Sequence, residues 1–223
     1  MKNNKFMYLL ILGFTFFSCK KEEVEVPKDS AVYDIVVQGM WAAASHPVNY
    51  PDNAHFSPIV GMTHNDKAAL FTIGTNASTG IKNMAETGKT TELDAEIDNM
   101  ISSGNVSSRV NGTGISSGTG GGVASLRVTG NHGLVSIVSM VAPSPDWYIG
   151  VQNISLIRNG EYITDTIISM ESFDAGTDSG TDFKSENKPT DPAGPISVIT
   201  DSPLGNGTEV RPALATIRFT LRR

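Results

Sequence analysis

Short runs of apolar residues, bounded by Gly, Pro, Asn and Asp, recur along the chain from Ser30 onward. Such runs are typical of β-strands joined by turns. The alternation is clearest over residues 215–221, where every second residue is apolar, which predicts one buried and one solvated face. The predicted strands are 32–37, 69–73, 125–128, 134–141, 148–156, 162–170, 196–200 and 215–221. About eight short strands with no regular helix between them predict an all-β fold, an antiparallel β-sandwich.

A helical period occurs once, around residues 79–103, and it predicts two short helices inserted between strands. In the first helix the apolar residues share one face up to a stop at Gly88; they are Ile81, Met84 and Ala85. In the second helix they recur four residues apart, at Leu93, Ile97 and Ile101. Thr91, with Asp94 three residues later, is the predicted cap of this second helix.

The first eighteen residues predict a cleaved signal peptide. Lys2 and Lys5 precede an apolar stretch, 6–17, that is too short to span a bilayer core of roughly 30 Å. The sequence 16–19 resembles a bacterial lipobox and contains the only cysteine of the chain, so Cys19 is the predicted lipidated N-terminus. The alternative is an ordinary signal peptide that leaves Cys19 as a buried free thiol.

Residues 19–30 are polar, charged and interrupted by Pro27, as expected of a flexible tether between a lipid and a folded domain at 31–223. Lysines followed by acidic residues just after Cys19 are similar to signals that send some Gram-negative lipoproteins to the outer face of the outer membrane. We therefore expect an outer membrane lipoprotein, facing either the cell surface or the periplasm. The alternative is that this segment is only a solvated linker.

Composition and charge exclude several classes of protein. One Cys among 223 residues rules out a disulfide framework and a Cys-rich metal site. The net charge is −6, and removal of residues 1–18 takes away two lysines and no acid, which leaves −8. A nucleic-acid partner is not expected, because phosphate binding needs clustered Lys and Arg.

The glycine-rich tract 111–122 raises the possibility of a phosphate-binding loop. It lacks the Gly-Lys-Ser/Thr ending of a P-loop, and Ser117 stands where the third glycine of a dinucleotide fingerprint would fall. The sequence predicts a flexible loop here.

Three aspartates occupy constrained positions after apolar runs. Asp146 follows Pro143-Ser144-Pro145, which leaves the backbone few options. Asp174 and Asp178 are separated by small residues that allow a tight curl. If the two loops meet at one end of the sandwich, Asp146, Asp174 and Asp178 would supply the anionic core of a calcium site, since calcium takes six to eight oxygen ligands. The alternative is that each aspartate only shapes its own turn.

Catalytic motifs receive little support. Asp178-Ser179-Gly180-Thr181 matches the short signature of an aspartic protease, but that chemistry needs two such aspartates and the sequence has one copy. No His-Glu-x-x-His motif is present, and the one Gly-x-Ser-x-Gly match, at 114–118, lies in the glycine-rich tract and not in an elbow between a strand and a helix, so we do not expect an enzyme. The four histidines lie in turn-like contexts and are expected to act as hydrogen-bonding spacers, and Trp41 and Trp147 as core anchors.

Several longer phrases resemble the spondin domain, the module found near the N-terminus of F-spondin and forming most of mindin. They begin with Trp41-Ala42-Ala43-Ala44-Ser45-His46-Pro47 and continue at 50–51, 54–61 with His64, 77–82, 85–88, 136–150 and 173–180. In this order they extend over roughly residues 31–223. The resemblance implies a β-sandwich of the C-two type with a calcium site at one end, where the family's aspartates match Asp146, Asp174 and Asp178.

The resemblance also implies a role in extracellular adhesion or recognition rather than catalysis. The family's own partners are not carried over, because this chain lacks the cysteines of the animal domains. We therefore predict a lipid-anchored protein of the cell envelope whose calcium site orders the loops that bind a surface or matrix ligand, either protein or glycan. The alternative is a structural envelope protein, or an accessory subunit of a complex, in which the metal serves stability alone.

Overall fold

The computed structural model describes residues 27–222, which form thirteen strands and two helices. In chain order the elements are β1 (Ser30–Gly39), β2 (His55–Phe56), β3 (Val60–His64), α1 (Thr79–Thr87), α2 (Thr91–Ser102), β4 (Val106–Asn111), β5 (Gly121–Thr129), β6 (Leu134–Ala142), β7 (Trp147–Ser155), β8 (Ile157–Arg158), β9 (Glu161–Tyr162), β10 (Asp165–Ser169), β11 (Glu171–Asp174), β12 (Ser197–Val198) and β13 (Ala215–Leu221). The signal peptide predicted at 1–18 and the predicted lipidation site, Cys19, lie outside the described residues.

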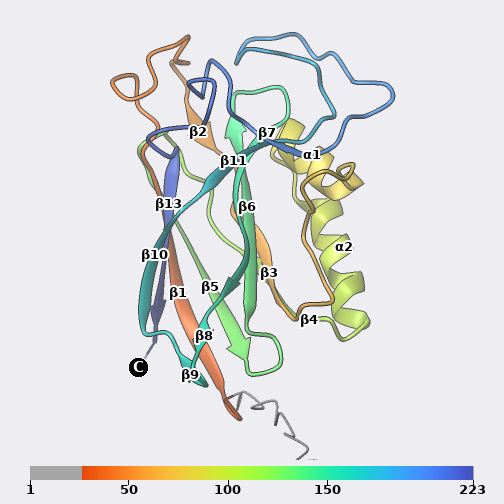
Figure 1. The fold of residues 1–223 in the computed structure, drawn as a ribbon, viewed down its shortest axis with the longest axis vertical. Helices are drawn as coiled ribbons and strands as arrows, with labels where there is room; N and C mark the ends of the chain where they lie inside the picture. The colour runs from red at the N-terminus through yellow and green to blue at the C-terminus, as the bar shows by residue number, and fades with distance from the viewer. Residues whose placement is uncertain (1–26, 223) are drawn as a thin grey trace, which may run out of the picture.

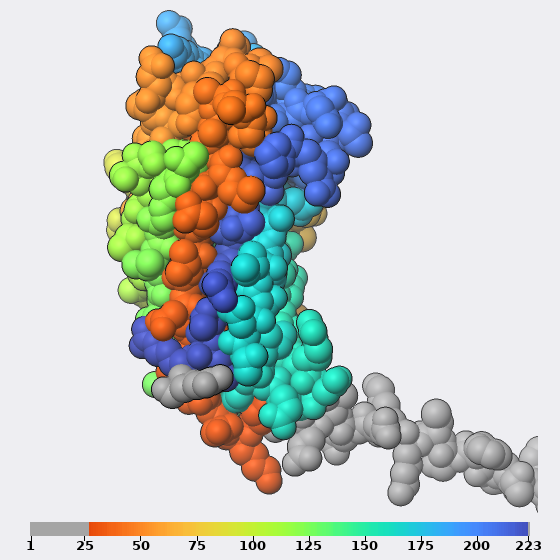
Figure 2. Space-filling view, turned by 90° about the vertical axis from the view of Figure 1, so that its left-hand side faces the viewer, coloured from red at the N-terminus to blue at the C-terminus, as the bar shows by residue number. Residues whose placement is uncertain are grey.

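Apart from the separate β8–β9 pair, the strands form two facing sheets in which the paired strands are antiparallel (Figure 1). The smaller sheet has the order β10-β13-β1-β5, and Figure 2 shows these four strands side by side on one face of the molecule. The larger sheet has the order β12-β11-β7-β6-β3-β4, with β2 paired to the end of β6. The predicted all-β sandwich is confirmed.

Two apolar clusters stabilise this arrangement. The first fills the space between the sheets, and the second lies between the larger sheet and the two helices. Strand β6 contributes to both, because its side chains alternate between the two faces. Val135, Ile137 and Val141 belong to the first cluster, and Val138, Met140 and Ala142 to the second. The helices therefore cover the outer face of the larger sheet, as Figure 1 shows.

Both predicted helices are present, and their ends are close to the predicted positions. Ser78 caps α1, since its hydroxyl oxygen accepts the Ile81 N–H over 3.1 Å, and Gly88 ends the helix in the left-handed conformation with φ of 69°. In the second helix Thr91 is the first helical residue, and the cap position falls on Thr90. The Thr90 hydroxyl donates to the Asp94 carboxylate and does not accept a backbone N–H of the helix.

Some predicted strands are wrong or incomplete. Residues 69–73 form no strand, because Leu70 and Phe71 are buried as irregular backbone before a turn in which Thr75 N–H bonds to Thr72 O. The run predicted at 162–170 is divided between β9 and β10, and of 196–200 only two residues are a strand. Strands β3, β4 and β11, and the two-residue strands β2 and β8, were not predicted. All five residues of β3 are buried, so it shows no alternation of apolar and polar residues.

The glycine-rich tract is a loop between β4 and β5, as predicted, but it is fixed by its contacts. Phe56 and Ile115 exchange two backbone hydrogen bonds of 3.0 and 3.1 Å, and Trp41 N–H bonds to Gly118 O over 2.9 Å. A Cβ at Gly118 would collide with the carbonyl oxygen of Trp41. Glycine at this position serves close backbone packing rather than flexibility.

Among the helices at 27–222, none combines the length and apolar character needed to cross a membrane.

Candidate metal centre

The three predicted aspartates lie at the same end of the sandwich, where β7 begins and β11 ends (top of Figure 1). Asp146 directly precedes β7, and Asp174 is the last residue of β11, opposite Trp147 in the strand pair. The pairing extends one step further, because Ala175 N–H bonds to Asp146 O over 3.1 Å. The loop after β11 then turns back over Asp146 and brings Asp178 to it. The two loops therefore meet, as the site hypothesis requires.

Asp146 is fully buried, and its two carboxylate oxygens differ sharply. Oδ2 accepts the backbone N–H groups of Thr177 and Asp178 over 2.7 and 3.0 Å, and the Thr177 hydroxyl over 3.3 Å. Oδ1 is buried and has no hydrogen-bond partner within the described residues. A buried carboxylate oxygen with nothing to bond is costly, so this atom is the strongest sign of a missing ligand.

Asp174 and Asp178 make the local turns that the alternative interpretation predicted. In each, Oδ1 accepts a backbone N–H two residues ahead, from Gly176 and Gly180 respectively, over 2.7 Å. Their remaining oxygens also have partners. Asp178 Oδ2 accepts the Lys188 backbone N–H over 2.8 Å, and Asp174 Oδ2 accepts the indole N–H of Trp147. Each carboxylate oxygen has two lone pairs, so these single bonds leave capacity for a metal. Turn formation and metal binding are compatible at both residues.

Burial and uncompensated negative charge together act on the carboxylates at this end. Burial, and then the charge of Asp174, raise the pKa of Asp146 to about 6. Burial also raises the pKa of Asp174, with a smaller contribution from the charge of Asp178. Among residues 27–222, no Lys, Arg or His forms an ion pair with any of the three. A bound cation would lower the energy of all three carboxylates at once.

The residues present fit a hard, oxygen-seeking cation. The donor set consists of carboxylates and neighbouring loop carbonyls, which are the ligands that calcium prefers. In the described part of the chain, no group of three His, Cys, Asp or Glu side chains is placed so that it could hold a metal ion, so the fit is one of donor type. Asp146 would offer its unpartnered Oδ1, and Asp174 and Asp178 the free lone pairs of their carboxylates.

Two aromatic residues belong to this site but were not predicted as part of it. Trp147 was expected to be a core anchor, and it is buried in the core, yet its indole N–H also donates to Asp174 Oδ2 over 3.2 Å. Tyr148 is buried with a hydroxyl that has no partner among the described residues, and burial raises its pKa. Their positions directly after Asp146 were the only available signal in the sequence.

A hollow of about 350 Å³ adjoins the acidic cluster. Its walls include Trp147, Asp174 and Val198, together with hydroxyl-bearing residues of the loops. Val198 is 36% exposed and lies opposite Phe173 in the β11–β12 pair. Asp174 therefore lies between the buried carboxylates and an open, partly apolar surface.

The other predicted residues have structural roles that their contacts explain. Each of the four histidines bonds to a nearby backbone carbonyl: His46 to Pro212, His55 to Asn53, His64 to Asn65 and His132 to Gly104. All four therefore form the expected hydrogen bonds, but His64 is the last residue of the buried strand β3 and does not lie in a turn. Trp41 is fully buried against the rings of Tyr50, Phe56 and Phe183.

Comparison with known proteins shows the family of this chain. The model of the family described as Spondin_N matches residues 31–207. Spondin-2 of Rattus norvegicus is 32% identical over 187 residues, which cover 81% of this chain and 56% of the relative. Spondin-2 of Homo sapiens is 32% identical, covering 77% and 53%. Spondin-1 of Mus musculus is 30% identical, covering 77% and 22%.

The matched region thus spans about half the length of Spondin-2 and about a fifth of Spondin-1. It contains all of β1 except Ser30, β2–β12, both helices and all three aspartates of the acidic end. The predicted family is therefore confirmed: this chain belongs to the Spondin_N family.

Proposed function

We propose that this chain is a calcium-binding recognition module, anchored by a lipid in the cell envelope, and that Asp146, Asp174 and Asp178 hold the metal. The unpartnered, buried Oδ1 of Asp146 is the observation that supports this most strongly. A divalent cation at this position would offset the burial, and the smaller mutual repulsion, that raise the pKa of Asp146 and Asp174. It would also fix the loops on which the three residues lie, so calcium would govern their order.

The hollow beside Asp174 favours recognition over a purely structural role. A binding surface needs accessible apolar area next to polar groups, and Val198 and the surrounding hydroxyls provide this. The ligand would be a protein or glycan at the cell surface or in the matrix. The second candidate is a structural or accessory envelope protein that uses the metal for stability alone.

The proposal includes lipidation of Cys19, which would hold the domain at the outer membrane. Mass spectrometry of the mature N-terminus tests this directly. The expected result is a diacylglyceryl-modified Cys19 that Cys19→Ser abolishes, with the variant released from the membrane fraction. An unmodified N-terminus at another residue would contradict lipid anchoring but leave the calcium proposal unaffected.

Thermal unfolding in chelator, calcium and magnesium tests the metal site. Calcium at about 100 times its dissociation constant should raise the free energy of unfolding by about 2.7 kcal/mol. Asp174→Asn should lose this increase, because it removes one anionic ligand. Asp165→Asn is the matched control, since Asp165 is an exposed aspartate paired with Arg218 on the outer sheet face.

The outcomes separate the two candidates. If calcium stabilises wild type and Asp174→Asn equally, or if neither ion stabilises wild type, the three aspartates would serve only to form turns. If calcium stabilises the chain, immobilised protein should then retain a surface protein or glycan in calcium and release it in chelator. Stabilisation without any calcium-dependent ligand would favour the structural role. The proposal assigns no catalytic role; hydrolase activity that Asp178→Asn abolished would contradict this.

A further inference from the structure

Strand β10 forms an edge of the smaller sheet whose outer side has no partner strand among residues 27–222. Two backbone bonds fix which groups face outward: Met170 N–H bonds to Ala215 O and Leu221 N–H to Thr164 O, both over 2.9 Å. Hydrogen-bonded positions alternate along an antiparallel pair, so the even-numbered residues bond to β13. The N–H and C=O groups of Asp165, Ile167 and Ser169 therefore point away from the sheet.

The opposite edge of the same sheet is covered. On β5, Val123 O accepts the Thr113 N–H and Val123 N–H donates to Thr113 Oγ1, each over 3.0 Å. Proteins usually protect open edges with Pro, Lys or a bulge. Residues 165–169, Asp-Thr-Ile-Ile-Ser, contain no Pro or Lys, and Ile167 is 60% exposed. The β10 edge is thus available for pairing with another strand.

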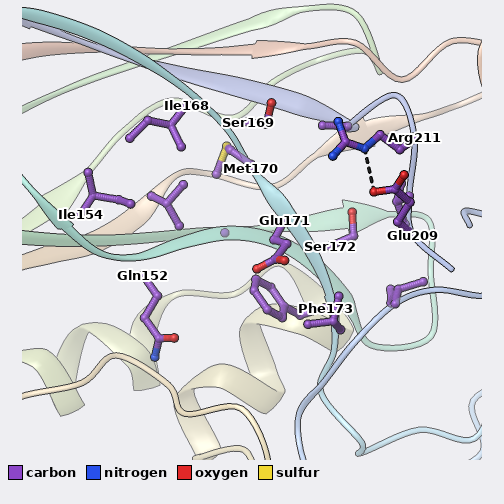
Figure 3. Close-up of a pocket in the computed structure, with 16 residues that line it drawn as sticks. Gln152, Ile154, Ile168, Ser169, Met170, Glu171, Ser172, Phe173, Glu209 and Arg211 are labelled. Atoms are coloured by element: carbon purple, nitrogen blue, oxygen red, sulfur yellow. Dashed lines mark hydrogen bonds and ion pairs between the residues drawn. The ribbon is translucent and has the colours of Figure 1, made fainter.

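A groove of about 470 Å³ runs beside this edge. It arises because the chain passes from β10 into β11 and changes sheets at Met170, so β10 separates from β7. Its apolar lining includes Val151, Ile154, Ile168, Met170, Ile199 and Val210. Figure 3 shows Ile154 and Ile168 at one end and the Glu209–Arg211 ion pair, of 2.7 Å, at the other.

The rim of the groove is negatively charged. Glu171 is exposed and lines it, and it forms no ion pair within residues 27–222. Glu209, by contrast, is already neutralised by Arg211. A ligand that places a cation beside Glu171 would complement the one charge here that lacks a counter-ion.

We propose that β10 accepts an extended peptide strand, with a large apolar side chain in the groove and a basic residue beside Glu171. Backbone pairing with Asp165, Ile167 and Ser169 supplies affinity, and the groove and Glu171 supply specificity. A second copy of this chain fits less well. Symmetric pairing of two β10 strands would place Ile167 against Ile167 on the outer face and leave the groove unfilled.

Selection from a random seven-residue peptide display library on the full chain tests the proposal. The counter-selection uses Ile167→Pro, which removes an outward N–H while sparing the bonds to β13. Enriched peptides should combine a large apolar residue with Lys or Arg. A synthetic copy of a selected peptide should bind Ile167→Pro at least about 10-fold more weakly than wild type, which corresponds to about 1.4 kcal/mol. Ile167→Ala, which keeps the N–H, is the matched control and should bind within about threefold.

Hydrogen exchange on the wild-type chain gives a second measurement in case Ile167→Pro fails to fold. The selected peptide should slow exchange of the Ile167 and Ser169 amides, and Glu171→Gln should weaken peptides that contain Lys or Arg more than neutral ones. No enrichment, unchanged binding to Ile167→Pro, or exchange that the peptide does not alter would overturn the proposal. A concentration-dependent dimer that Ile167→Pro abolishes would also overturn it and assign the edge to a second copy.

Discussion

Asp165 and Asp146 each lie at the start of a strand, yet the groups that meet their carboxylates are of opposite kinds. Asp165, on the outer face of the smaller sheet, accepts two bonds from the Arg218 guanidinium over 2.8 and 2.9 Å. These bonds lower the pKa of Asp165. Asp146 is buried beside other acids, meets only backbone N–H groups and one hydroxyl, and has its pKa raised.

The contrast extends to the neighbouring acids of each region. On the outer face, Asp34 also pairs with an arginine, Arg222. At the acidic end, the described residues provide no such partner for Asp174 or Asp178. Arginines thus compensate Asp34 and Asp165 on the exposed sheet face, where charge costs little, whereas the acidic end has no such compensation, although charge costs most when it is buried. Buried charge of this kind is typical of functional sites, and here it favours a cation from outside the chain.

The largest expected difference between the regions is in stability. Asp146→Ala removes the oxygen that accepts the Thr177 and Asp178 N–H groups, and it leaves both N–H groups buried without this acceptor. At pH 5 in chelator, where repulsion contributes little, the free energy of unfolding in urea should fall by about 3 kcal/mol. Asp165→Ala should leave the unfolding midpoint nearly unchanged, since its ion pair is exposed. Similar midpoints for the two variants would contradict the comparison.

The second difference is in the direction of the pH dependence. The pKa of Asp146 is about 6 in the folded chain, above the value of about 3.9 in unfolded chains. Its contribution to stability is therefore fully present below about pH 4 and lost as pH rises through about 6. In chelator, unfolding at pH 7.5 and pH 5 should differ by about 1 to 2 kcal/mol in favour of pH 5. Asp146→Asn should remove most of this difference, since only the raised pKa of Asp174 then remains at this end, and saturating calcium should reduce it.

Asp165 contributes in the opposite sense. Its lowered pKa gives stability that is present above the unfolded pKa and lost as pH falls through the folded one. Asp165→Asn should therefore leave the change between pH 7.5 and pH 5 intact. If it abolished that change as fully as Asp146→Asn, the assignment of the effect to the acidic end would be wrong.

A smaller effect is expected at Trp147, whose indole N–H donates to Asp174 Oδ2. Trp147→Phe keeps an aromatic ring in the core and removes the donor, so the free energy of unfolding should fall by about 1 kcal/mol. In wild type, calcium should change the tryptophan fluorescence through Trp147. In Trp147→Phe this change should vanish, although Trp41 remains. A fluorescence change that persists in Trp147→Phe would place the responding metal elsewhere.

Much of the fold was predictable because its clearest signals are periodic. The alternation at 215–221 identified β13, and the spacing of Ile81 and Met84 identified α1. Strand β3 could not be found in this way, since it is buried on both faces and includes Thr63 and His64, whose side chains bond to Ser108 and Ser136. A strand of that kind has no polar face to give it a period of two.

The acidic end was predictable only in part. The prolines before Asp146 and the small residues after Asp174 indicated constrained turns that could meet. What the sequence could not give was the asymmetry within one side chain, with Asp146 Oδ2 fully bonded and Oδ1 without a partner. That asymmetry depends on how residues 176–178 fold over Asp146, a non-local contact across about thirty residues of chain.

The most direct test of metal binding at the acidic end is terbium luminescence, because Trp147 lies beside Asp174 and can sensitise a bound lanthanide. Terbium stands in for calcium, and the emission is read on excitation of tryptophan. Wild type and Asp165→Asn should both show emission that calcium displaces, and Asp146→Asn should show none. Emission that survives in Asp146→Asn, or its absence from wild type, would contradict the account.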